Sequence, residues 1–150
     1  MTIVAAWVTQ RGTDQECLRC VTDARLSTRD GESIFPLTDT GAKLFSIPLN
    51  AYSPAASGGY TNRYLSSSLG LAFCGDSLIG LPLASTLSSI TSQLINPHTE
   101  SNPSLDDIGH LTVWIAQRSR TVCELRDRRA NIVDSRWLFL VGAKSGNDMS

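Results

Sequence analysis

Two long segments with helical periodicity restrict the fold of this chain more than any other feature. Apolar residues recur at helical spacing over residues 77–95 and again over residues 104–129, as on the buried face of an amphipathic helix. They are Leu83, Leu87, Ile90 and Leu94 in the first segment, and Ile108, Leu111, Ile115, Val122 and Leu125 in the second. Two such helices combined with several strands predict an α+β protein.

Both helical segments begin with capping residues. Asp76 or Ser77 can cap the first helix, and Pro82 falls near its first turn, where a missing N–H costs little. Ser104 followed by Asp107 resembles a capping box at the start of the second helix.

Short segments rich in β-branched and aromatic residues predict the strands. Residues 2–9 and 17–22 are separated by a polar turn that contains Gly12, a pattern typical of a β-hairpin. Further strands are expected over residues 44–47, 68–74 and 137–141. The polar residues 27–33 and the Gly- and Ser-rich residues 50–68 are expected to be surface loops.

Composition indicates a single domain over residues 1–150 and excludes several classes of partner. The chain is 41% hydrophobic and 18% charged, which fits one globular domain with its own core. Its net charge is -1, so neither nucleic acid nor an anionic membrane is an expected partner. The N-terminus lacks the pattern of a secretion signal, and Asp76 and Pro82 interrupt the most apolar interior stretch, so we expect a cytoplasmic protein.

The cysteines do not predict a metal or redox site. Cys17 and Cys20 form one CxxC pair without a second, and His98 and His110 lack zinc-finger spacing from it. A redox CxxC would open a helix after a strand, whereas strand-like sequence continues here. We expect reduced thiols on a strand and its turn, and no metal or cofactor.

The first residues carry the chemistry that most resembles a catalytic group. Thr2 follows Met1 directly, so removal of Met1 would leave a hydroxyl nucleophile whose own α-amine can serve as its base. That amine has an ordinary pKa of about 8, which leaves part of it unprotonated near neutral pH.

Charged residues and a glycine lie at the ends of the expected strands. Asp23 and Arg25 follow the second strand, Lys43 precedes the strand at residues 44–47, and Gly75 follows the strand at residues 68–74. An ordinary surface ion pair is the alternative explanation for Asp23 and Lys43.

This order resembles the proteasome β-subunit family of N-terminal-nucleophile hydrolases, in particular its bacterial, self-compartmentalising branch. Thr2 in Thr-Ile-Val matches the terminal threonine of that family, and Asp23 and Arg25 in Asp-Ala-Arg match its aspartate and the basic residue after it. Lys43 in Gly-Ala-Lys-Leu-Phe matches the lysine beside the nucleophile, and Gly75 in Cys-Gly-Asp matches the glycine of the oxyanion hole.

The resemblance implies an αββα sandwich, with antiparallel sheets and two long helices on one face. The chain spans only the first half of that fold, so we expect the sandwich to be incomplete and truncated at its C-terminal side. The family's additional Ser and Asp around the threonine find no matching position here. The first hairpin and the loop before Lys43 are longer than is usual in the family.

The resemblance implies a threonine-type peptidase subunit that cleaves polypeptides and assembles with identical subunits into a ring. An unfoldase is a further partner compatible with this function. Lys43 would stabilise the threonine alkoxide, Asp23 would orient Lys43, and the Gly75 N–H would bind the oxyanion. One alternative is an inactive family member that acts as a structural or interaction subunit. Another is a non-proteolytic amidohydrolase of the same superfamily.

Overall fold

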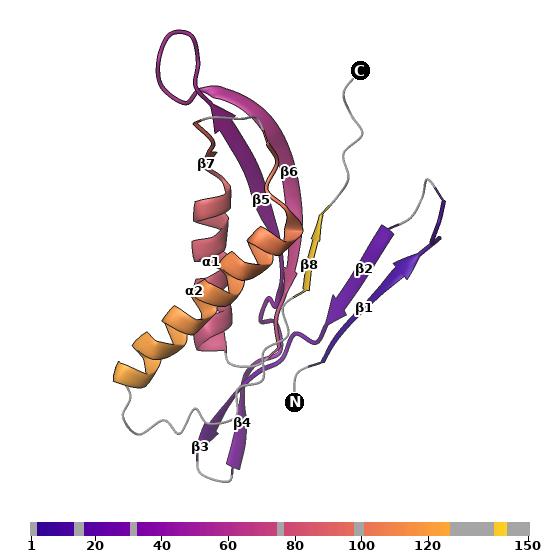
Figure 1. Ribbon diagram of the computed structural model, residues 1–150. Coiled ribbons are helices and arrows are strands. Elements are labelled where there is room, and N and C mark those ends of the chain that lie inside the picture. Colours follow the sequence, from indigo (N-terminus) through magenta and orange to yellow (C-terminus); the bar gives the residue numbers. More distant parts are fainter. Residues whose placement is uncertain are drawn as a thin grey trace.

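The core of the molecule is a hairpin of two long strands. A computed structural model describes residues 3–13, 17–30, 33–74, 77–97, 101–126 and 140–143. In it, β5 (Leu44–Ser53) pairs antiparallel with β6 (Asn62–Ala72), and the sheet is completed by β7 (Leu94–Ile95), parallel to β5, and β8 (Leu140–Ala143), antiparallel to β6. The sheet order is β7-β5-β6-β8 (Figure 1).

Two helices cover one face of this sheet. α1 (Ser77–Thr91) and α2 (Leu105–Arg126) both lie on the same side of β5 and β6 (Figure 1). Alternate residues of the strands face the helices, because successive side chains of a strand point to opposite faces. The resulting core contains Ile47, Leu49, Leu69, Leu71, Leu83, Ala84, Leu87, Ile108, Ile115 and Ala116.

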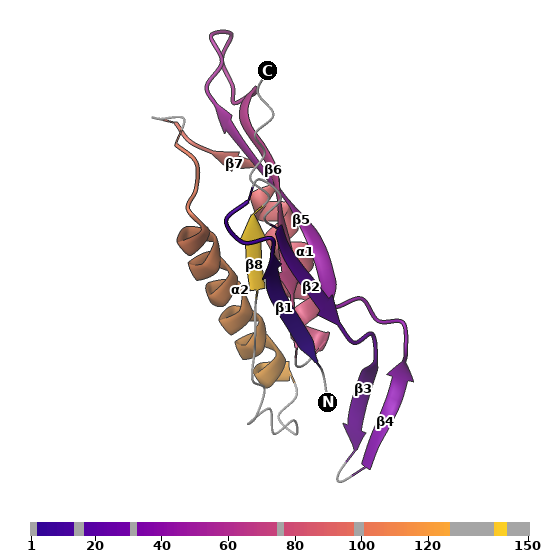
Figure 2. The same cartoon turned by 90° about the vertical axis from the view of Figure 1, so that its right-hand side faces the viewer.

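The middle of the opposite face of the sheet carries small and polar residues. In register with one another are Ser46 and Gly70, Pro48 and Ser68, and Asn50 and Ser66. A hairpin of β1 (Val4–Thr9) and β2 (Cys17–Thr22) stands on this side, and Figure 2 shows it in front of the sheet with α1 behind. The molecule therefore has three layers, which are the helices, the central sheet and the hairpin.

A second hairpin extends away from the body of the molecule. It consists of β3 (Leu26–Asp30) and β4 (Ser33–Thr38), which pair antiparallel. Figures 1 and 2 both show it projecting beyond the end of the central sheet. Phe35 and Leu37 on β4 are largely exposed.

The mixed α+β class and the first hairpin are confirmed, but the loop predicted at residues 27–33 is wrong and the loop predicted at residues 50–68 is limited to residues 54–61. Residues 27–33 contain most of β3 and the start of β4, and residues 50–68 contain the end of β5 and more than half of β6. The predicted strands at residues 44–47 and 68–74 are thus short parts of much longer strands.

Both predicted helices exist, and residues 127–129 of the second lie outside the described residues. α1 ends at Thr91, so Leu94 lies in β7 rather than on the helix, and Pro82 lies inside α1 instead of in its first turn. The capping box at the start of α2 is present: Ser104 N and Oγ donate to Asp107 Oδ2 over 3.1 and 2.7 Å. These hydrogen bonds lower the pKa of the Asp107 carboxyl.

Not every prediction falls within the described residues. Of the strand expected at residues 137–141, the structure describes only residues 140 and 141, which begin β8. Within the part of the chain that is described, no helix is both long enough and apolar enough to cross a membrane.

Candidate functional site

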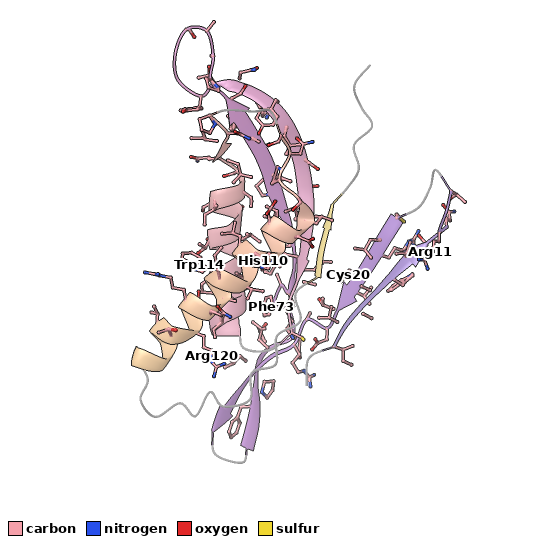
Figure 3. All side chains as sticks on the ribbon, in the orientation of Figure 1. Arg11, Cys20, Phe73, His110, Trp114 and Arg120 are labelled. Carbon is pink, nitrogen blue, oxygen red and sulfur yellow. The ribbon has the colours of Figure 1, made fainter. Side chains whose placement is uncertain are left out.

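The buried lysine at the start of β5 is the centre of the candidate site. Lys43 is only 2% exposed, although lysine is rarely buried without a partner. Its main-chain carbonyl accepts a hydrogen bond from Phe73 N over 3.1 Å, which fixes its backbone to the segment that follows β6. Phe73 lies where the two hairpins approach the end of the central sheet (Figure 3).

The Lys43 ammonium is satisfied by a carboxylate and a carbonyl. Lys43 Nζ lies 3.1 Å from Asp23 Oδ1 and 3.2 Å from Asp23 Oδ2. It also donates to the main-chain carbonyl of Arg25. The structure thus brings together Asp23 and Lys43, which are 20 residues apart in the chain.

Asp23 also holds the beginning of β1. Ile3 N donates to Asp23 Oδ1 over 3.0 Å, and Asp23 N donates to Ile3 O over 3.1 Å. Burial by itself would raise the pKa of Asp23, but the hydrogen bond from Ile3 and the hydrogen bond and charge of Lys43 outweigh it. The pKa of this carboxyl therefore lies below its ordinary range, and the group is an anion at neutral pH.

Arg25 contributes to the site through its backbone rather than its side chain. Its Nε donates to Asp39 Oδ1 over 2.6 Å, and the two side chains are 62% and 68% exposed. The guanidinium therefore lies in a solvent-exposed ion pair, whereas the carbonyl of the same residue accepts from Lys43 Nζ.

Thr2 and Gly75, the other predicted site residues, lie outside the described residues. Their neighbours in the chain can be placed. Ile3, which follows Thr2, is bonded to Asp23, and Phe73, which precedes Gly75 by two positions, is bonded to Lys43. Ile3 and Phe73 thus attach the chain next to Thr2 and the chain just before Gly75 to the Asp23–Lys43 pair.

The main-chain contacts of this site were missed at the sequence level. The Ile3 amide, the Arg25 carbonyl and the Phe73 amide are backbone groups, and any residue type except proline at a donor position would supply them. The same holds for Gly41, whose amide donates to Ala24 O over 2.7 Å.

Two of the cysteines lie close together in the chain on one strand. Cys17 and Cys20 both lie on β2, but three positions apart, so their side chains point to opposite faces of the strand. The Thr9 hydroxyl lies 2.8 Å from Cys17 Sγ, and this hydrogen bond, with help from Arg19, lowers the pKa of the exposed Cys17 thiol. Among the described residues, no three His, Cys, Asp or Glu side chains gather as metal ligands would.

Comparison of this chain with known protein families, with curated proteins and with solved structures finds no match.

Proposed function

We propose that the protein is a threonine-type N-terminal-nucleophile hydrolase, most specifically a peptidase subunit, whose nucleophile is Thr2 after removal of Met1. One observation carries the proposal. A buried lysine ammonium rests on an aspartate that simultaneously binds the amide of Ile3, the residue next to Thr2. A positive charge is thereby held next to the start of the chain.

Each group of the candidate site has one role in the proposed reaction. The α-amine of Thr2 accepts the hydroxyl proton while Oγ attacks the amide carbonyl of the substrate, and the same proton passes to the leaving amine as the C–N bond breaks. Water, deprotonated by the same α-amine, then hydrolyses the ester, which releases the acid and restores the Thr2 hydroxyl. The Lys43 charge favours the alkoxide and disfavours protonation of the nearby amine. Asp23 keeps Lys43 charged and oriented, the Arg25 carbonyl fixes its Nζ, and the Gly75 N–H is the proposed oxyanion donor.

The same proposal includes an αββα sandwich in which β1 and β2 belong to a second sheet. Support comes from the hairpin itself, because Trp7, Val8, Leu18 and Val21 occupy both of its faces and all are substantially exposed. A strand pair that is apolar on both faces is typical of an inner layer.

The proposed partners are polypeptide substrates in the cytoplasm, identical subunits in a closed ring, and an unfoldase that delivers substrates. Exposed apolar side chains on α2, among them Val113, Trp114 and Val122, offer surface that a neighbouring subunit could bury. A ring buries such a surface in every copy, because cyclic closure leaves no free interface.

An inactive structural subunit is the second candidate, favoured by the amount of exposed apolar surface on the hairpins. It would keep the Asp23–Lys43 pair for stability and would not need a free Thr2 amine. An amidohydrolase that does not cleave proteins would use the same groups on a different substrate.

Intact-mass measurement followed by reaction with a β-lactone or an epoxyketone tests the proposal. The expected result is loss of Met1 and one adduct, mapped by peptide mass spectrometry to Thr2. Because the Cys17 thiol is exposed and has a lowered pKa, the Cys17→Ser variant is the control and should be labelled as fully as the wild type. An adduct that disappears in Cys17→Ser and persists in Thr2→Ala would refute the nucleophile. Retention of Met1 would favour the structural subunit.

A further inference from the structure

The loop that leads to Lys43 lies directly against the segment that carries its partners. Gly41 N donates to Ala24 O over 2.7 Å. A Cβ atom added to Gly41 would lie 2.3 Å from Leu26 Cγ and 2.5 Å from Leu26 Cδ1. Real Cβ atoms do not approach a neighbour so closely, so a side chain at position 41 would force Leu26 or the backbone of residues 39–43 to shift.

The Asp23 carboxylate and the Arg25 carbonyl, which bond Lys43 Nζ, link these two segments. Asp23 and the Arg25 carbonyl lie on one side, next to Ala24 and Leu26, and Lys43 lies two residues after Gly41 on the other. The exposed Arg25–Asp39 ion pair joins the same two segments from outside, where such pairs contribute little. The separation of the segments at Gly41 therefore sets the position of the ammonium.

We propose that Gly41 is a positioning residue, which lets residues 39–43 approach residues 23–26 closely enough to hold Lys43 Nζ on Asp23. The catalytic part of this inference rests on the proposed hydrolase function, whereas the geometric part does not. A side chain at position 41 would push against Leu26 and withdraw Lys43 from its carboxylate.

Accessibility of the Lys43 amine measures this position without any assumption about activity. Reductive methylation with ¹³C-formaldehyde, followed by NMR and peptide mapping, gives the modification rate of Lys43 as a function of pH. We expect Gly41→Ala to raise that rate by about tenfold or more, because the buried amine becomes locally accessible. Removing the clash in the double variant Gly41→Ala/Leu26→Ala should return the rate toward the wild-type value. Gly70→Ala is the matched control, because a Cβ there meets nothing within 4 Å, and it should leave the rate unchanged.

The rate of β-lactone labelling at Thr2 provides the second readout. We expect a decrease of roughly 10- to 100-fold in Gly41→Ala, since a displacement of about 1 Å can cost that much, with recovery in the double variant.

A wild-type rate of Lys43 methylation in Gly41→Ala overturns the inference, whatever the labelling shows. Absence of labelling in the wild type, with faster methylation in Gly41→Ala, refutes the hydrolase and leaves the role of Gly41 intact. If Gly41→Ala does not fold, folding of the double variant with a protected Lys43 supports the inference, and failure of both variants to fold overturns it.

Discussion

Because the Lys43 ammonium is buried, its partner Asp23 is important for stability. A partner in a surface ion pair would contribute little. Lys43 is almost fully withdrawn from water, while the Asp23 side chain is 27% exposed. Without the carboxylate, the cost of withdrawing the ammonium from water is no longer offset by an opposite charge. The interpretation of this pair as an ordinary surface ion pair is therefore wrong.

The first prediction concerns Asp23→Asn. We expect it to lower the free energy of unfolding by about 2–3 kcal/mol at pH 7, because it leaves a buried ammonium without its counter-charge. Urea unfolding measures this loss. Asp106→Asn, which removes an exposed aspartate on α2, is the matched control and should cost less than about 1 kcal/mol.

The difference between wild type and Asp23→Asn should depend on pH in one direction. The pKa of Asp23 is lowered in the folded protein, so its stabilisation is complete above the unfolded pKa of about 3.9 and is lost as pH falls through the lower folded pKa. Unfolding curves at pH 7, 5 and 3 should show a constant difference down to about pH 5 and a narrowing below about pH 4. A difference that widens in acid would contradict the assigned direction of the shift.

The second prediction separates catalysis from stability at Lys43. Lys43→Met keeps most of the side-chain volume and removes the charge, so we expect β-lactone labelling of Thr2 to fall by roughly 10²-fold or more. A folded Lys43→Met protein with wild-type labelling would remove the lysine from the mechanism. Arg25→Ala is the comparison, because its carbonyl remains in place, and labelling should change by less than about fivefold.

At the scale of elements, glycines in the two helices should respond to alanine with opposite signs. A Cβ on Gly80 in α1 would lie 2.3 Å from Phe73 Cε2, whereas a Cβ on Gly109 in α2 meets nothing within 4 Å. Gly80→Ala should therefore destabilise by about 1–3 kcal/mol through overpacking against the Phe73 ring. Gly109→Ala should stabilise by roughly 0.5–1 kcal/mol, because alanine restricts the unfolded chain and favours the helix. Thermal unfolding of both variants tests this, and equal signs would contradict the packing of α1.

The elements that were predicted correctly are those whose pattern is apolar. The helical faces and the β1–β2 hairpin have many apolar residues at regular spacing, so their burial or pairing could be read from the sequence. β3 was missed because it is polar, and the first part of β6 was assigned to a loop because it contains Ser66 and Ser67 and lacks an apolar pattern. Asp30-Gly31 is a strong turn signal between strands, but the polar strand before it concealed the hairpin.

The site was predictable to the extent that it depends on side chains. The sequence indicated Asp23 and Lys43 because charges at strand ends are visible, and the structure places them in contact. It could not indicate that Arg25 acts through its carbonyl, since a backbone group has no residue-type signature. The proximity of Gly41 to Leu26 depends on how two loops pack, which local patterns do not encode.

At the scale of the whole molecule, the three layers leave large apolar side chains exposed on the hairpins and on α2. Ile3, Trp7, Val8, Leu18, Val21, Phe35, Leu37, Val113, Trp114 and Val122 are all at least partly open to solvent. Trp114 is stacked under Arg118, with the guanidinium carbon 5.5 Å from the ring centroid (Figure 3 labels Trp114 on α2). Exposed aromatic and arginine side chains of this kind are typical of interfaces.

The final prediction is a discrete homo-oligomer. Multi-angle light scattering at several protein concentrations should give one mass that does not change on dilution, as expected for a closed ring. Trp114→Asp should reduce that mass, whereas Thr121→Asp, an exposed substitution on the same helix, should not. A clean monomer at all concentrations would refute the ring.

The β3–β4 hairpin is attached in a way that lets the chain be lengthened there. The hairpin leaves the body after Arg25 and returns before Gly41, and both ends are joined by Gly41–Ala24, Arg25–Asp39 and Lys43–Asp23 contacts. A sequence inserted between β3 and β4 leaves these three contacts in place, and longer closed loops cost little more than short ones. The hairpin is therefore a natural insertion point, where a reporter or an affinity tag can be placed with the lysine pair left undisturbed.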